Sequence, residues 1–316
     1  MSSLNGEKVF ITGATGFIGS NLTRRSLDKG AEVFINIRNT SDTWRIKDIL
    51  QDVNPVPVDI TEYEKLKDFL KEIRPDIIFH TATFGGNAEQ KNTKKIIETN
   101  FIGTVNLLRS CRDIDVNLFV NTGSSSEYGI KNSVMTESCL LEPVTEYGAS
   151  KAAATLFCQT TAVTKNLPIV TLRLFSPYGR YEQKSRLVPS LILAVLQNIN
   201  PRITSRQFVR DFIFIEDVLD AYEAVINLKN ASGKIFNIGS GQQHSVGEVV
   251  DMIVGLLGNE VTYEVGIPQA WKNEPTFWQA DIQRAKSELD WEPKYSLGKG
   301  LAATIDWFKL NKGLYE

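Results

Sequence analysis

The stretch that decides the fold reads Lys8-Val-Phe-Ile-Thr-Gly-Ala-Thr-Gly-Phe-Ile-Gly19. Its first part holds three consecutive apolar residues, the pattern of a parallel strand that is buried on both faces. Glycine then recurs at every third position, at Gly13, Gly16 and Gly19. Residues 21–30 follow as a predicted helix that ends at a glycine, a common helix terminator. The stretch therefore predicts a strand, a glycine-rich turn and a helix in succession.

This succession is the context in which a glycine-rich turn binds a dinucleotide. Gly13 permits the tight turn, Gly16 lets the backbone approach a pyrophosphate, and Gly19 lets helix and strand pack closely. The helix N-terminus offers N–H groups and the positive end of the helix dipole to phosphates. The spacing is GxxGxxG rather than the commoner GxGxxG, so the turn alone also fits an ordinary strand-to-helix connection.

The composition is that of a globular protein with a full core. The chain has 316 residues, of which 42% are hydrophobic and 23% charged, and its net charge is -2. This balance gives no sign of nucleic acid or of an anionic membrane as a partner, and the longest apolar stretch is too short to span a bilayer. Three scattered cysteines and two histidines indicate neither disulfides nor a metal site. We expect a cytoplasmic protein without metal, membrane or nucleic-acid partners.

Predicted strands and helices alternate along the first half of the chain. Further strands are expected at 32–38, 55–59, 76–82, 117–122 and 168–174, and helices at 61–73, 93–113 and 147–165. This alternation predicts an α/β fold of the Rossmann type, a doubly wound parallel sheet with helices on both faces and ligands at the carboxyl ends of the strands. A segment at 233–239 is expected to return to the sheet.

The expected domain organisation follows from this pattern. Residues 1–175, with returning segments at about 211–240, form the dinucleotide-binding domain. Residues 176–210 and 241–316 form a smaller, mixed and discontinuous substrate domain.

The end of the second strand bears on the type of dinucleotide. An acidic residue there binds the ribose 2′-OH of NAD, whereas this chain reads Ile37-Arg38-Asn39. Arg38 suits the 2′-phosphate of NADP, although a solvated loop arginine is the alternative. Asp59, after the third strand, is placed to accept from the adenine amino group, or else caps a turn. These residues favour NADP(H), with NAD(H) possible.

Tyr147 and Lys151 stand one helical turn apart, on one face of a predicted helix. An ammonium beside a phenol lowers the pKa of the phenol, so Tyr147 is a candidate general acid or base at a sugar hydroxyl or carbonyl. Ser124, at the end of the fifth strand, is a candidate donor to the same oxygen. The alternatives are a surface Tyr–Lys pair and an ordinary serine-rich turn.

Together these motifs resemble the extended short-chain dehydrogenase/reductase superfamily, whose members modify nucleotide sugars. The matching segments occur in the family's order at 13–19, 59–60, 100–104, 124–129, 147–151 and 210–217. The resemblance implies that Ser124, Tyr147 and Lys151 form a catalytic trio and that NAD(P) moves a hydride at a sugar carbon, usually C4. It implies cofactor contacts at Gly13, Gly16, Phe17, Ile18, Gly19, Arg38, Asp59, Ile60, Ala82, Asn100, Tyr147 and Lys151.

For the nucleoside-diphosphate sugar, the resemblance implies contacts at Thr83, Ser125, Ser126, Ser176, Arg186, Val188, Arg210 and Lys272. Two of these positions depart from the family pattern. Ser176 stands where an asparagine is typical, and Lys272 lies near the place of a second phosphate-binding arginine.

The residues before Tyr128 bear on the reaction. The corresponding segment of sugar 4,6-dehydratases carries a glutamate at the position of Ser126. In this chain the glutamate is Glu127, one residue later, and a shift of one residue sends the side chain to the opposite face. The Ser-Ser-x-Glu-Tyr-Gly pattern resembles GDP-4-keto-6-deoxymannose reductases. We therefore predict a 4-ketoreductase acting on a nucleoside-diphosphate 4-keto-6-deoxyhexose, with a 4-epimerase holding NAD as the alternative. A 4,6-dehydratase, a non-catalytic NADP-binding protein and a scaffold protein are weaker hypotheses.

Helices 93–113 and 147–165 resemble the pair that forms the dimer interface of this superfamily. The run Ala152-Ala-Ala154 would allow close approach of a second copy, although internal packing explains the same alanines. We expect a homodimer.

Overall fold

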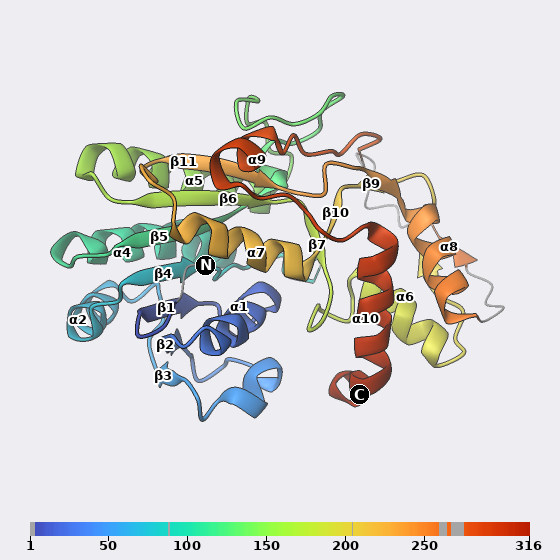
Figure 1. The fold of residues 1–316 in the computed structure, drawn as a ribbon, viewed down its shortest axis with the longest axis horizontal. Coiled ribbons are helices and arrows are strands. Elements are labelled where there is room, and N and C mark those ends of the chain that lie inside the picture. Colours follow the sequence, from blue (N-terminus) through green and yellow to red (C-terminus); the bar gives the residue numbers. More distant parts are fainter. Residues whose placement is uncertain (1–3, 88, 204, 259–263, 267–274) are drawn as a thin grey trace.

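The computed structural model describes residues 4–87, 89–203, 205–258, 264–266 and 275–316. Its centre is a seven-stranded sheet in the order β11-β6-β5-β4-β1-β2-β3, and all of its pairings are parallel. Figure 1 shows the strands one above another in this order. The strands are β1 (Lys8–Thr12), β2 (Glu32–Asn36), β3 (Asn54–Val56), β4 (Ile77–His80), β5 (Leu118–Ser124), β6 (Ile169–Leu174) and β11 (Lys234–Ile238). The predicted Rossmann-type α/β fold is confirmed.

Successive residues of the central strand enter different cores. Val9 and Ile11 of β1 belong to one hydrophobic cluster and Phe10 to another, because side chains alternate between the two faces of a sheet. Helices α1 (Phe17–Asp28) and α7 (Ile215–Ile226) pack on the first face. Helices α2 (Tyr63–Ile73), α4 (Gly103–Ser110) and α5 (Glu146–Lys165) pack on the second. Both faces are thus covered, as the apolar strand pattern predicts.

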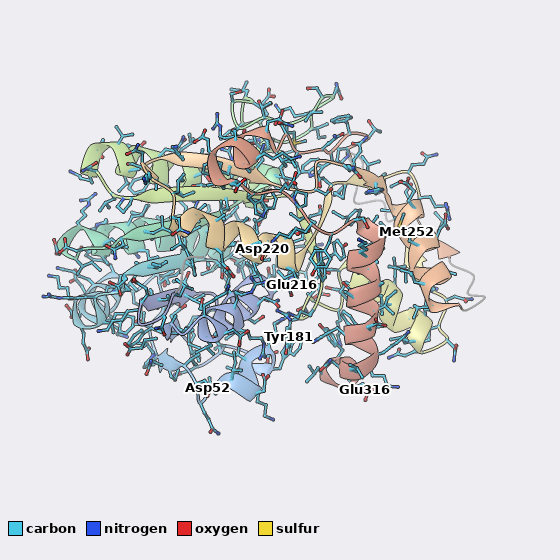
Figure 2. The ribbon with its side chains drawn as sticks, viewed as in Figure 1. Asp52, Tyr181, Glu216, Asp220, Met252 and Glu316 are labelled. Atoms are coloured by element: carbon cyan, nitrogen blue, oxygen red, sulfur yellow. The ribbon has the colours of Figure 1, made fainter. Side chains whose placement is uncertain are left out.

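An ion-pair cluster fixes α1, the helix that follows the glycine turn, against α7. Arg25 donates to Glu216 at 2.7 Å and to Asp220 at 3.1 Å, and it also pairs with Glu223. Figure 2 labels Glu216 and Asp220 on α7. The cluster is half-buried, so solvent screens it less than an exposed pair.

Several predicted boundaries were wrong. The helix expected at 93–113 is α3 (Thr93–Ile97), a π-helical turn η2 (Glu98–Ile102), α4 and a 3₁₀ turn η3 (Cys111–Asp113). A π turn inserts an extra residue and is frequent at functional sites. The second strand ends at Asn36 rather than at residue 38, and α1 begins at Phe17, four residues earlier than expected.

The rest of the chain builds smaller elements beyond the sheet. Helices α6 (Leu187–Leu196), α8 (Val246–Leu257) and α10 (Leu297–Asn311) pack on one another at one end of the molecule (Figure 1). The remaining elements are η1 (Trp44–Ile49), η4 (Ser125–Glu127), β7 (Ser176–Tyr178), β8 (Arg202–Ile203), β9 (Val209–Arg210), β10 (Phe212–Phe214), β12 (His244–Ser245), β13 (Glu264–Val265), α9 (Gln283–Leu289) and η5 (Lys312–Tyr315).

The division into two domains stays a prediction. Within the described ranges, no helix is both long and apolar enough to cross a membrane.

Candidate active site

A cavity of about 350 Å³ lies where β1, β2 and β4 end, against the start of α1. The residues predicted as ligand contacts that line it are Gly13, Gly16, Phe17, Ile18, Gly19, Arg38, Asp59, Ile60, Ala82, Thr83 and Arg186. Other lining residues were missed by the sequence analysis, among them Thr15, Asn36, Ser41, Arg45, Gly86, Glu182 and Gln183. The cavity therefore joins the glycine turn to the segment that precedes α6.

The glycine turn has no room for a side chain at Gly13 or Gly19. A Cβ on Gly19 would stand 2.2 Å from the Gly13 carbonyl oxygen, and a Cβ on Gly13 would stand 2.7 Å from the Ala82 backbone. Gly13 also has a φ of +71°, a conformation in which most residues are strained. The first N–H groups of α1, which have no partner within a helix, face this closely packed turn. These features fit the diphosphate of a dinucleotide.

The residues predicted for the adenosine end lie together. Arg38 Nη1 is 3.6 Å from Asp59 Oδ2, and both side chains are partly exposed. Asp59 Oδ1 accepts hydrogen bonds from Thr61, so this aspartate also caps the turn before α2. Asn36, the last residue of β2, accepts from the Gly13 N–H at 3.2 Å and lines the cavity. An NAD-binding acid was looked for in the sequence at residue 38, taken as the end of the second strand. The strand ends at Asn36 instead, and the side chain at that position is a neutral amide.

The candidate trio comes from two elements. Ser124 ends β5, while Tyr147 and Lys151 stand one turn apart at the start of α5. The phenol of Tyr147 lies against Gly86, which lines the cavity. Ser124, Tyr147 and Lys151 do not themselves line the cavity, but the phenol reaches its edge through Gly86 and hydrogen-bonds with Ser124.

The expectation that Lys151 lowers the pKa of Tyr147 was wrong. Burial raises the pKa of Tyr147, and the hydrogen bonds of its hydroxyl with Ser124 and Thr83 oppose this only in part. Arg186 is the cation that lowers the pKa of the phenol most. Lys151 is itself 2% exposed, and burial lowers its pKa.

Ser124 is held in place by the turn η4 that follows it. The Ser124 hydroxyl accepts from the Ser126 N–H at 3.2 Å, and the Ser124 N–H donates to Glu127 at 2.8 Å. The adjacent Ser125 hydroxyl accepts from the Trp278 indole N–H at 3.2 Å. The Arg210 guanidinium lies over the same indole ring, 5.5 Å from its centroid. Trp278, which the sequence analysis missed, therefore joins Ser125 to Arg210.

Two predicted contacts are not free to touch a ligand. The Asn100 side chain, in the π turn η2, is fully buried and hydrogen-bonds to Thr83, Phe84 and Ser150. It therefore positions the loop after β4 instead of lining the cavity. Val188 is 1% exposed and packs in the hydrophobic core, since it lies on the inner face of α6.

The remaining predicted sugar contacts are spread out. Arg186 donates to the Gly86 carbonyl at 3.3 Å, and both residues line the cavity. Ser176 lies on β7, where its N–H donates to the Asp211 carbonyl. Lys272 lies outside the described residues.

Residues 9–239 match the model of the NAD dependent epimerase/dehydratase family. The chain belongs to this family. The match confirms the expected superfamily and the expected class of enzyme, but not the 4-ketoreductase subgroup.

Relatives and solved structures agree with this assignment. The chain is 29% identical to the uncharacterized UDP-glucose epimerase YtcB of Bacillus subtilis, over 94% of this chain and 96% of that protein. It is 27% identical to a dTDP-glucose 4,6-dehydratase of Xanthomonas campestris, over 96% and 93%. The structure of UDP-glucuronic acid 4-epimerase from Bacillus cereus, in complex with UDP-glucuronic acid and NAD, superposes with a TM-score of 0.85 at 28% identity, covering 96% of this chain and 99% of that one.

Proposed function

We propose that this protein is a nucleotide-sugar 4-epimerase that acts on C4 of a nucleoside-diphosphate hexose. The observation that supports the proposal is the contact of the Tyr147 ring with Gly86, a residue of the cavity that begins at the glycine turn, together with the hydrogen bond between Tyr147 and Ser124. A UDP-glucuronic acid 4-epimerase and a UDP-glucose epimerase among the similar proteins support it.

Each residue of the site has a proposed role in the reaction. A nicotinamide dinucleotide bound along the glycine turn supplies the acceptance and return of a hydride. Tyr147 takes the proton of the C4 hydroxyl and gives it back, acting as general base and then general acid. Ser124 holds the same oxygen by a hydrogen bond, and Lys151 binds the ribose of the dinucleotide. We assign residues 176–210 and 241–316 to the sugar-nucleotide side, with Arg186 and Arg210 as donors to phosphates.

The site is poorly equipped for 4,6-dehydration. That reaction needs a base for the proton at C5, and Ser126 stands at the expected position. Glu127 is fully buried and bound to Arg173, so its carboxylate does not reach the cavity. The three residues after Ser124 therefore offer two hydroxyl groups and no free carboxylate.

A 4-ketoreductase is the second candidate, and the adenosine end of the cavity favours it. Asn36 brings no negative charge to repel a 2′-phosphate, while Arg38 and Ser41 line the same rim. A net reductase consumes and exchanges its dinucleotide, and NADPH is the usual donor for that task. An epimerase instead recycles the hydride, so it has no need to release the dinucleotide.

One experiment separates the two reactions. The protein is purified and denatured, and any released dinucleotide is identified; protein that comes without dinucleotide is titrated with NADPH and NADH. Retained NAD, with interconversion of UDP-glucose and UDP-galactose or of the corresponding uronates, supports the epimerase. An empty protein that prefers NADPH, and loses that preference in Arg38→Ala but not in the exposed control Arg112→Ala, supports the reductase instead.

We also propose a homodimer formed through α3, η2 and α5. Exposed apolar side chains gather on these adjoining helices, namely Ile97, Ile102, Leu156 and Val163, whose exposed fractions run from 39% to 78%. The alanines expected to allow close approach play a different part, because Ala152 and Ala154 are buried within the molecule. A second copy would cover the apolar face, which is otherwise exposed to water.

A further inference from the structure

Glu182 is a buried carboxyl group at the cavity that the proposed reaction does not use. It lies between β7 and α6, lines the same cavity as the glycine turn, and its side chain is 6% exposed. Its Oε1 atom is 3.7 Å from Arg186 Nε. Its Oε2 atom is buried and has no hydrogen-bond partner among the described residues. A buried, unsatisfied oxygen is costly, so this atom indicates a ligand.

Arg45 fixes this segment against the glycine turn. Its guanidinium donates to the Tyr181 carbonyl at 2.7 Å, to the Gln183 side chain at 2.7 Å and to the Thr15 carbonyl at 3.4 Å. Residues on both sides of Glu182 are therefore held to the same guanidinium as the turn. Tyr181, labelled in Figure 2, has a φ of +65°, a strained conformation for a bulky residue. Strain of this kind is typical of functional segments.

The surroundings of Glu182 decide its charge. The groups that act on it are Arg45 from η1, Arg186 at the start of α6, Tyr178 from β7 and Tyr315 from η5. The Tyr315 hydroxyl also donates to the Glu182 backbone carbonyl at 2.9 Å. Burial outweighs the two arginines and raises the pKa of Glu182 to about 8. The carboxyl group therefore carries a proton at neutral pH and is an O–H donor.

We propose that Glu182 binds a diphosphate in its protonated form, donating a hydrogen bond from Oε2 to a phosphate oxygen, so that binding takes up a proton at alkaline pH. The proposal rests on the proposed dinucleotide site. The link through Arg45 to Thr15 favours the diphosphate of the dinucleotide, and the diphosphate of the sugar nucleotide offers the same chemistry. A deprotonated Glu182 repels either anion, which gives the cavity a proton-dependent affinity.

Calorimetric titration of the whole protein tests the proposal with NAD⁺ and, separately, with UDP. Each titration is made at about pH 6.5 and about pH 9, on either side of the pKa, in two buffers of different ionisation enthalpy. At the higher pH we expect uptake of up to one proton and a loss of affinity of up to about tenfold per pH unit. At the lower pH we expect neither. The ligand that shows the uptake identifies which diphosphate Glu182 contacts.

Two variants test whether the Glu182 carboxyl group is the one that takes up the proton. Glu182→Gln keeps the shape but cannot titrate, so it should bind at the higher pH as tightly as at the lower pH and take up about one proton less. The control Glu223→Gln, in the ion-pair cluster between α1 and α7, should keep the wild-type uptake. Binding without proton uptake by the wild type, or with unchanged uptake in Glu182→Gln, overturns the role of Glu182 and leaves the dinucleotide site standing. If neither NAD⁺ nor UDP binds, both the role of Glu182 and the dinucleotide site are overturned.

Discussion

Glu127 and Arg173 form an ion pair of 2.7 Å at the carboxyl end of β5, with side chains that are 0% and 2% exposed. The other carboxylate oxygen of Glu127 accepts from the Ser124 N–H and from the Thr155 hydroxyl. Arg173 also donates to the Tyr128 hydroxyl at 2.9 Å. The glutamate next to the candidate trio thus holds the Ser124 backbone and is not among the residues that line the cavity.

The first prediction concerns this pair. In Glu127→Gln the Arg173 guanidinium stays buried without a counter-charge, so we expect a loss of about 3–5 kcal/mol in the free energy of unfolding. Chemical denaturation measures it. Glu64→Gln, which changes an exposed glutamate of α2, should alter stability by no more than about 0.5 kcal/mol. Equal losses in the two variants would contradict the structural role of the pair.

The second prediction concerns Tyr147. Tyr147→Phe removes the proton-transferring hydroxyl, so turnover should fall by about 10²–10⁴ while dinucleotide affinity is kept. Because burial raises the pKa of Tyr147, little phenolate exists at neutral pH. Oxidation of the C4 hydroxyl by the wild type should therefore become faster as pH rises, which a pH profile of kcat measures. Tyr63→Phe on α2 is the control and should match the wild type. Unchanged turnover in Tyr147→Phe would instead favour a binding protein without catalysis.

Elements that are set by local sequence patterns are predicted well from the sequence. The run of apolar residues before Gly13 and the spacing of the glycines place β1, the turn and α1, and the order of motifs brings Ser124 and Tyr147 together. Asn36 was missed because the exact end of a short strand depends on pairing with its neighbours. In the same way, no local signal marks the π turn that contains Asn100.

Long-range packing explains the other gaps. Glu182 owes its place to Arg45, which lies 137 positions earlier in the chain and reaches both sides of it. Trp278 contacts Ser125 from a position 153 residues away. Such contacts depend on how distant segments pack, and neither residue belongs to a recognisable motif.

The third prediction separates ligand binding from folding at the glycine turn. Gly16 has an ordinary φ of -85°, and an added Cβ would stand 3.2 Å from the Gly13 carbonyl oxygen. Gly16→Ala should therefore fold, at a cost of about 1 kcal/mol or less, yet bind the dinucleotide at least about tenfold more weakly, because the methyl group occupies the path of the pyrophosphate. Fluorescence titration with NADH measures the affinity.

The control for that variant is Gly298→Ala at the start of α10, where a Cβ would meet nothing within 4 Å. It should leave the affinity for NADH unchanged and stabilise the helix by about 0.5–1 kcal/mol. Full affinity in Gly16→Ala would mean that the diphosphate does not approach this turn.

The fourth prediction concerns the proposed dimer. Leu156 on α5 is 53% exposed, and the Phe101 and Phe157 rings meet edge-on between η2 and α5, with centroids 6.1 Å apart. A charge at the centre of this apolar face would be buried in the dimer without a partner. Leu156→Asp should therefore weaken association by at least about 100-fold, or ~3 kcal/mol, while the monomer stays folded. Sedimentation velocity over a range of protein concentrations measures this.

Leu310→Asp is the control, because Leu310 on α10 is 86% exposed and lies outside the face; it should sediment as the wild type does. A wild type that is monomeric at all concentrations, or a Leu156→Asp variant that still dimerises, would rule out this face as the interface.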